Sequence, residues 1–326
     1  MKIKSLKVAI IGAGRWGINH VKTANSLVES KNIFVCDGNI IIKEKIKTIS
    51  EDINFTTNFD EILQNSEINT VIVASPAETH FSISKELLKQ KKHVLVEKPI
   101  TLHLNEAIEL NDLAVENNVK LMVGHVLLYH PAILYIKEAI LSGKLGKLQY
   151  IYSNRLNLGA IRSEENILWS FAPHDISIIQ FLVEKDPISV VAHGDIFLQS
   201  NIEDTTITYL KYPDNVSAHI FVSWLHPFKE QRLVVIGEKG MFVFDDTIKT
   251  EKLKFYNKGF LITENGIEKF DQDYEAIELQ NVMPLAEEQI HFYNSILNDQ
   301  KPRTNGEHAI SVQKILEAAT KSLKQI

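Results

Sequence analysis

The first third of the chain alternates short apolar runs, rich in β-branched residues, with stretches of helical period. The apolar runs lie at residues 8–11, 33–36, 70–74, 93–96 and 120–123. The stretches between them predict helices, chiefly over 17–28, 59–63, 78–89 and 104–117. Strands that alternate with helices at this spacing predict a doubly wound parallel sheet, which binds its ligands at the carboxyl ends of its strands.

Beyond residue 123 the pattern changes to longer β-runs joined by short turns. These runs lie at 148–156, 188–197, 205–211, 216–224, 232–236, 241–244 and 253–260, with helices expected at 132–141, 173–183, 284–297 and 308–323. Short turns between runs imply a mostly antiparallel sheet. We therefore predict an α/β protein with two domains. Residues 1–123 form a Rossmann-type parallel domain, and residues 124–326 form an α+β domain with a large open sheet.

One face of such an open sheet is covered by helices. If its other face is apolar, a partner sheet must cover that face, so we expect a homodimer or homotetramer formed through the C-terminal sheet.

Composition narrows the class of protein. The 326 residues are 44% hydrophobic and 23% charged, with a net charge of −6, which argues against nucleic acid as a partner. Cys36 is the single cysteine, so no internal disulfide forms, and we expect a cytoplasmic protein. No apolar run reaches the length of a membrane span. The histidines lack ligand spacing with cysteine or carboxylate partners, so we expect no metal site.

Three glycines follow the first apolar run in the pattern G-x-G-x-x-G: Gly12, Gly14 and Gly17, with Arg15 and Trp16 inside the motif. The first glycine permits the turn, the second lets a pyrophosphate approach the backbone, and the third lets helix and strand pack closely. Asp37 ends the second run, twenty residues after the last glycine. A carboxylate there accepts hydrogen bonds from a ribose and repels a 2′-phosphate, which predicts NAD as the cofactor.

Two further motifs lie at predicted strand ends. Ser75 and Pro76 form a strand-to-helix turn, and His80 follows in the first turn of the helix. Turn chemistry and a cofactor contact explain Ser75-Pro76 about equally well, and for His80 local hydrogen bonding to the loop is the more common explanation. The tripeptide Glu97-Lys98-Pro99 follows the fourth of the five β-runs. A lysine at that edge loses solvation and is suited to acid–base or hydroxyl-polarising work, although a surface ion pair is the alternative.

Taken together, these motifs resemble the Gfo/Idh/MocA oxidoreductases. The resemblance rests on the glycine motif, on Ser75-Pro76 with His80, and on Glu97-Lys98-Pro99. It implies that Lys98 lies near the nicotinamide and the reacting hydroxyl. It also implies cofactor contacts from the residues of all three motifs.

The stretch 168–179 carries a further point of resemblance. The family has a histidine here that faces the substrate and acts as base, usually with an aspartate four residues earlier. His174 matches the histidine, but Ser170 stands at the aspartate position. Asp175 is adjacent, yet one residue along a helix is a rotation of roughly 100°, so it need not face the same cleft. We expect His174 to take the hydroxyl proton while Lys98 stabilises the alkoxide.

Polar groups suited to sugars and phosphates cluster after residue 150. Arg155, Asn157 and Arg162 are the candidate substrate ligands, because guanidinium groups match phosphate oxygens. Ordinary strand alternation also explains exposed polar residues. The stretches around residues 153–159, 168–176 and 223–232 look like the branch of the family that oxidises nucleotide sugars. That branch converts C3 of UDP-N-acetylglucosamine, or of its uronic acid, to a ketone, toward 3-amino sugars of lipopolysaccharide or other cell-surface glycans.

Two other functions stay open at this point. One is a dehydrogenase of a free polyol or sugar such as inositol. The other is a non-catalytic NAD-binding regulatory protein, against which Lys98 and His174 argue. A departure from the family also weakens any transfer of substrate contacts from its inositol- or glucose-type members. Many members carry Arg-Phe shortly before the proline at position 131, whereas this chain has Tyr129-His130.

Overall fold

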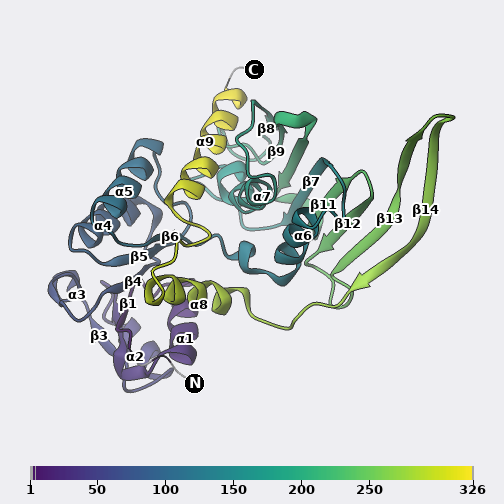
Figure 1. Cartoon of the computed structure of the whole chain (residues 1–326). Coiled ribbons are helices and arrows are strands. Elements are labelled where there is room, and N and C mark those ends of the chain that lie inside the picture. The colour runs from purple at the N-terminus through teal and green to yellow at the C-terminus, as the bar shows by residue number, and fades with distance from the viewer. Residues whose placement is uncertain (1–2, 4, 325–326) are drawn as a thin grey trace. The chain divides into compact units, whose positions relative to one another are not determined.

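The computed structural model describes residues 3 and 5–324 and divides the chain into two compact units (Figure 1). The first unit comprises residues 1–129 and 282–310, and the second comprises residues 130–281 and 311–326. Residues 124–129 and 282–310, which the sequence placed in the second domain, thus belong to the first unit. The physical reason is packing across a long sequence separation. The 3₁₀ turn η2 (Val126–Tyr129) packs on helix α8 (Pro284–Leu297).

The first unit contains a six-stranded, fully parallel sheet in the order β3-β2-β1-β4-β5-β6. Its strands are β1 (Val8–Ile11), β2 (Ile33–Cys36), β3 (Asn54–Thr56), β4 (Thr70–Val73), β5 (His93–Val96) and β6 (Leu121–Val123). The helices between them are α1 (Gly17–Leu27), α2 (Ile42–Lys47), α3 (Phe59–Gln64), α4 (Ala77–Lys89) and α5 (Leu104–Glu116). The predicted doubly wound sheet is confirmed, with β3 and α2 as additions that the sequence pattern did not reveal.

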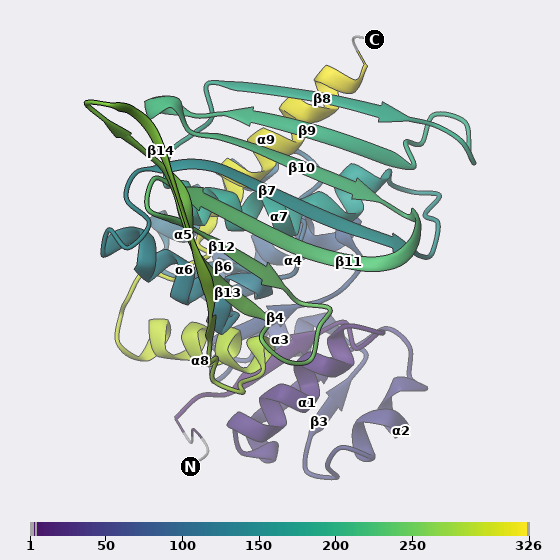
Figure 2. The same cartoon turned by 90° about the vertical axis from the view of Figure 1, so that its right-hand side faces the viewer.

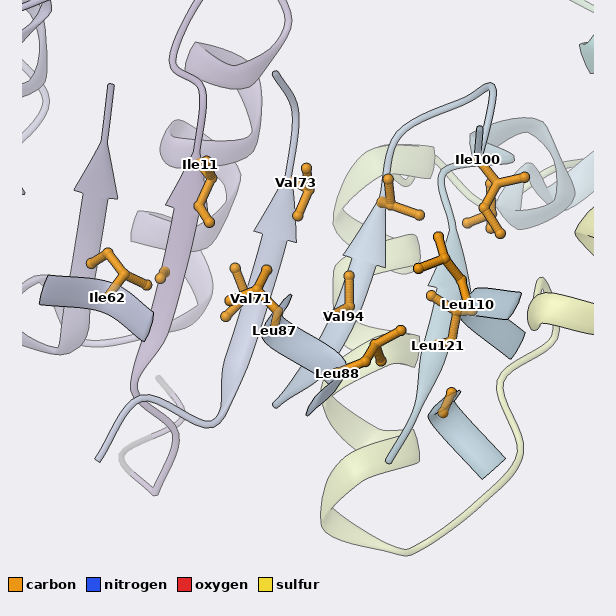
Figure 3. Close-up of a cluster of buried hydrophobic side chains, with 14 of the residues drawn as sticks. Ile11, Ile62, Val71, Val73, Leu87, Leu88, Val94, Ile100, Leu110 and Leu121 are labelled. Carbon is orange, nitrogen blue, oxygen red and sulfur yellow. The ribbon is translucent and has the colours of Figure 1, made fainter. Parts of the chain in front are cut away.

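The strands of this sheet are apolar because their residues are buried on both faces of the sheet. Every residue of β1 and β4 is buried, as expected for a parallel sheet covered on both faces. Figure 3 shows side chains of β1, β4, β5 and β6 meeting Leu87 and Leu88 of α4 and Leu110 of α5. This core holds the strands side by side, so that their carboxyl ends, where the motifs found in the sequence lie, share one edge of the sheet.

The second unit contains an eight-stranded sheet in the order β14-β13-β12-β11-β7-β10-β9-β8, whose long strands are visible in Figure 2. The strands are β7 (Leu148–Leu158), β8 (Ser189–Asp195), β9 (Thr205–Lys211), β10 (Ser217–Ser223), β11 (Leu225–Gly237), β12 (Gly240–Asp245), β13 (Leu253–Thr263) and β14 (Gly266–Ile277). Among these strand pairs only β7 and β10 run parallel. The mostly antiparallel open sheet is therefore confirmed.

The second unit also contains the helices α6 (Pro131–Leu141), α7 (Ile167–Val183) and most of α9 (Gly306–Leu323). The first turn of α9, up to residue 310, belongs to the first unit. Helix α7 packs on β7, β9 and β10. None of the helices within the described residues is long and apolar enough to cross a membrane.

Two local predictions need correction. Helix α7 was expected to begin at Pro173 but begins at Ile167, because the side chain of Asn166 caps it by accepting a hydrogen bond from the Trp169 N–H at 3.1 Å. Pro173 therefore lies inside the helix. Strand β14 was not predicted, because both of its faces are largely exposed and its polar residues follow no clear alternation. It forms an edge of the sheet, where burial imposes little pattern.

Candidate active site

The glycine motif forms the turn between β1 and α1, and each glycine has a distinct geometric reason. Gly12 has φ +84°, and a Cβ there would lie 2.7 Å from the backbone of Ser75. A Cβ on Gly17 would lie 2.0 Å from the carbonyl oxygen of Gly12. A Cβ on exposed Gly14 would meet no atom within 4 Å. Open space over the second glycine is what a pyrophosphate needs in order to approach the backbone, so the turn fits a dinucleotide.

Asp37 lies at the end of β2 and is tied to this turn. Its Oδ2 accepts a hydrogen bond from the Ala13 N–H at 2.7 Å, and its Oδ1 accepts one from the Asn39 N–H at 2.8 Å. The carboxylate is thus held beside the glycine turn, where it fits the ribose of an adenosine and repels a 2′-phosphate. These contacts support the predicted preference for NAD.

Replacing Asp37 with serine is expected to reduce the preference for NAD over NADP about tenfold or more. The substitution removes the negative charge that opposes a 2′-phosphate, and tenfold corresponds to about 1.4 kcal/mol. Dissociation constants for NAD and NADP, measured by calorimetry on both proteins, give this ratio. An unchanged ratio would assign Asp37 a purely structural role in the turn.

The Ser75-Pro76 turn is linked to the next strand end through His80. The buried imidazole contacts two backbone carbonyl oxygens, that of Pro99 through Nδ1 at 2.7 Å and that of Ser75 through Nε2 at 2.9 Å. His80 therefore joins the turn after β4 to the turn after β5. The hydrogen bonds of the His80 ring that the structure describes are thus to the protein backbone. The backbone of Ser75, in turn, lies against the glycine turn.

The tripeptide after β5 brings Glu97 against the glycine turn as well. Glu97 Oε1 accepts hydrogen bonds from Trp16 Nε1 at 2.6 Å and from His20 Nε2 at 2.7 Å. Its Oε2 accepts one from the backbone N–H of Lys98 at 3.2 Å. Lys98 itself is half-buried, and the Lys98–Pro99 peptide bond is cis. The carboxylate thus connects α1 to the turn that carries the proposed catalytic lysine.

The protonation state of Glu97 follows from these donors. Burial alone would raise the pKa of Glu97, but the hydrogen bonds from His20, Trp16 and the Lys98 backbone outweigh it and lower the pKa below its ordinary value. The group is therefore an anion, although most of its side chain is removed from water. Gly124 makes room for it, because a Cβ at that position would lie 2.9 Å from the carboxyl atoms of Glu97.

In the second unit, His174 lies on α7 and is half-buried. Its neighbour Asp175 is buried and holds a different set of partners. Asp175 Oδ2 accepts a hydrogen bond from Arg155 Nε at 2.7 Å, and its Oδ1 accepts one from Arg155 Nη2 at 3.0 Å and one from Ser153 Oγ at 2.5 Å. This carboxylate binds α7 to β7. The described contacts of Arg155 are thus with a protein carboxylate.

The remaining predicted substrate ligands are more accessible. Arg162 lies in the segment between β7 and α7, and its side chain is 56% exposed. Asn157 lies near the end of β7 and is half-buried. Arg15, which was predicted as a cofactor contact, is exposed in the glycine turn.

Several residues of the first unit contribute to the site without a signal in the sequence pattern. His20, Gly124 and Gln289 surround Glu97 or its partners, yet they lie on α1, after β6 and on α8. Only the GxGxxG spacing could have drawn attention to His20, as the residue one turn into α1. No cluster of three or more potential metal-ligating side chains occurs among residues 3 and 5–324.

A glycine turn that fits a dinucleotide, a carboxylate beside it and a lysine at the end of another strand of the same sheet form the arrangement expected of a dinucleotide-dependent oxidoreductase. Comparison with known families gives the same result. Residues 6–125 match the model described as an oxidoreductase family with an NAD-binding Rossmann fold. Residues 133–243 match the model of the GFO/IDH/MocA C-terminal domain. The chain belongs to the Gfo/Idh/MocA family and is an NAD-dependent oxidoreductase.

Individual relatives differ in substrate. The scyllo-inositol 2-dehydrogenase (NAD(+)) of Bacillus subtilis is 25% identical over 98% of this chain and 94% of its own length. The UDP-N-acetylglucosamine 3-dehydrogenase of Acidithiobacillus ferrooxidans is 27% identical over 58% of each chain. A solved structure of the latter enzyme superposes with a TM-score of 0.85 at 21% identity, covering 99% of both chains. These similarities leave the choice of substrate to the site residues.

Proposed function

We propose that this protein oxidises the C3 hydroxyl of a UDP-N-acetylated hexose, UDP-N-acetylglucosamine above all, to the 3-keto sugar used for 3-amino-sugar synthesis. The observation that carries the oxidoreductase chemistry is the joint placement of the glycine turn, Asp37 and the Glu97-Lys98 turn at one edge of the first unit's sheet. The substrate rests on similarity to the UDP-N-acetylglucosamine 3-dehydrogenase, in sequence over part of the chain.

The cofactor is held by the glycine turn and by Asp37, and when bound it supplies the hydride acceptor. In this proposal His174 removes the proton of the substrate hydroxyl, because an imidazole ordinarily titrates close to neutrality. Lys98 donates a hydrogen bond to the oxygen as negative charge develops on it. Arg162 and Asn157 bind the diphosphate and the sugar, since their side chains are accessible. Arg155 holds β7 against α7 through Asp175.

A free polyol such as inositol is the second candidate, and one observation favours it. The scyllo-inositol enzyme of Bacillus subtilis matches nearly the whole chain, whereas the UDP-sugar enzyme matches 58% of it in sequence. The exposed guanidinium of Arg162 favours a phosphorylated substrate instead. A non-catalytic NAD-binding protein would need neither Lys98 nor His174.

A substrate panel tests the proposal directly. Purified protein with NAD is offered UDP-N-acetylglucosamine, its uronic acid, UDP-glucose, myo-inositol and scyllo-inositol, and NADH formation is followed by absorbance. We expect turnover with the first compound, and none from the His174→Ala variant, which still binds NAD. Turnover of inositols alone would replace the proposed substrate. No turnover with any secondary alcohol would favour the regulatory function.

We further propose that the open face of the second sheet pairs with a second copy of the chain. Residues on one face of β9 and β10, such as Thr208 and Ile220, are buried on the side of α7. On the other face, Ile207 and Tyr209 are 46% and 42% exposed, and Tyr209 aligns with His219 of β10. Burying such apolar side chains stabilises a dimer.

The double variant Ile207→Glu/Tyr209→Glu is expected to be a folded monomer. Carboxylates on both exposed positions make burial of this face unfavourable. Light scattering after size-exclusion chromatography gives the mass, and circular dichroism checks the fold. Ile188→Glu, another exposed apolar position just before β8, is the control and should keep the wild-type mass. A wild-type protein that is already monomeric would refute the paired sheet.

A further inference from the structure

Five side chains of the first unit form a continuous hydrogen-bond chain that ends at the glycine turn. Tyr293 donates from its hydroxyl to Gln289 Oε1 at 3.1 Å, and Gln289 Nε2 lies 3.1 Å from His20 Nδ1. His20 Nε2 lies 2.7 Å from Glu97 Oε1, and Trp16 Nε1 lies 2.6 Å from the same oxygen. Tyr293, Gln289 and His20 are fully buried. The chain therefore connects α8 to the turn that binds the cofactor.

The geometry determines which nitrogen of His20 carries the proton. Gln289 Nε2 also contacts the backbone carbonyl oxygen of His20 at 3.1 Å, and a carbonyl oxygen only accepts hydrogen bonds. This contact, with the Tyr293 hydroxyl on the opposite amide atom, fixes the orientation of the Gln289 amide. Its NH₂ group then donates to His20 Nδ1, so the proton is on Nε2. His20 therefore donates from Nε2 to Glu97 Oε1.

A second carboxyl group lies near Glu97, and its pKa is shifted in the opposite direction. Glu288 on α8 is fully buried, and neither of its carboxyl oxygens has a hydrogen-bond partner among the described residues. Burial, reinforced by the charge of Glu97, raises the pKa of Glu288 well above its ordinary value. Of the two acidic groups, the donors around Glu97 favour its charged form, whereas burial favours the neutral form of Glu288.

The position of Glu97 relative to a dinucleotide follows from the fold. In a doubly wound sheet the dinucleotide lies across the carboxyl ends of the strands, around the point where strand order reverses. Here Asp37, at the end of β2, marks the adenosine side, and the glycine turn after β1 lies at the reversal. The nicotinamide half then extends toward β4 and β5. The carboxylate of Glu97 follows β5, is hydrogen-bonded to the glycine turn, and keeps 13% of its side chain exposed.

We propose that the Glu97 carboxylate, held as an anion by Trp16 and by the Gln289–His20 pair, selects the oxidised, cationic nicotinamide over the reduced, neutral one. An anion beside the ring attracts the cationic nicotinamide, whereas the neutral, reduced ring gains no comparable attraction. Gln289 acts as a positioning residue in this arrangement, because it sets the tautomer with which His20 donates to Glu97.

The test measures the dissociation constants of NAD⁺ and NADH by calorimetry, without substrate, and compares their ratio between variants. Glu97→Gln is expected to weaken NAD⁺ about tenfold more than NADH. Glu288→Gln is the matched control: it is the same chemical change at the neighbouring buried acid, and it is expected to leave the ratio within twofold. Glu97→Asp keeps the charge and is expected to keep most of the preference, even where both affinities fall.

Equal weakening of both cofactor forms by Glu97→Gln would overturn the proposal and leave Glu97 with a structural role. The proposal would also be overturned if Glu288→Gln changed the ratio of the NAD⁺ and NADH dissociation constants as much as Glu97→Gln does. The wild-type protein supplies a measurement that does not depend on variants: NAD⁺ is expected to bind at least as tightly as NADH. A tenfold tighter binding of NADH by the wild type would contradict selection by the anion, even if Glu97→Gln fails to fold.

Discussion

Replacing Lys98 with methionine is expected to lower kcat for NADH formation about a thousandfold while changing the affinity for NAD by no more than a few-fold. Methionine fills a similar volume but cannot donate a hydrogen bond, so the developing alkoxide loses its stabilising charge. Positioned proton donors and acceptors contribute about 10²- to 10⁴-fold to rates. Lys98 follows the strand β5, and Glu97 accepts its backbone N–H, so the turn keeps its shape in the variant.

The control is Lys89→Met, the same change at the end of α4, where the lysine pairs with Glu86 on the surface. It is expected to retain wild-type kcat, because exposed pairs contribute little. Stopped-flow and steady-state absorbance at saturating NAD measure the rates, and calorimetry measures the affinity. If Lys98→Met kept a tenth or more of the wild-type rate, the lysine would not be the group that assists the reacting hydroxyl.

Replacing Gly14 with alanine is expected to weaken NAD binding about 10- to 100-fold with no loss of thermal stability. A Cβ at this position meets nothing within 4 Å in the protein, so the fold accommodates it. The methyl group instead occupies the space over which a pyrophosphate approaches the backbone, and overpacking of this kind costs about 1–3 kcal/mol. Calorimetry and thermal denaturation of the cofactor-free protein separate the two effects.

Gly17→Ala provides the contrast within the same turn. Its Cβ would lie 2.0 Å from the carbonyl oxygen of Gly12, a contact that the backbone must move to relieve. We expect Tm to fall by roughly 5–10 °C, at about 2–4 °C per kcal/mol for a unit of this size. If Gly14→Ala destabilised the fold as much as Gly17→Ala while sparing NAD affinity, the open space over Gly14 would not be the cofactor path.

The two domains' architectures were predictable because each has a distinct pattern of burial. A parallel sheet covered on both faces needs apolar strands, and residues 8–11 and 71–74 are apolar. The boundary between the two domains was harder to predict from the sequence. Residues 282–310 return to the first unit through the packing of α8 on η2, and an amphipathic helix does not encode which of two cores its apolar face joins.

Some residues of the candidate site could likewise be predicted from the sequence, and others could not. The glycine motif, Asp37 and Lys98 are recognisable because local turn geometry and strand-end position depend on neighbours in sequence. Arg155 shows the limit of this reasoning. A guanidinium on a strand suits a phosphate equally well as a carboxylate, and only the approach of α7, which brings Asp175 to 2.7 Å from it, decides between them.

By itself the sequence determined the class of this protein: a dinucleotide-binding α/β domain with a lysine at the carboxyl edge of its sheet, joined to a mostly antiparallel sheet. Short-range backbone requirements and the period of burial carry that information. The tertiary structure alone decided that Glu97 is held as an anion, because its donors Trp16 and His20 lie 81 and 77 residues away. The charge state of a carboxyl group depends on which groups surround it in the folded protein. Contacts between residues far apart in sequence produce no periodic pattern of polar and apolar positions.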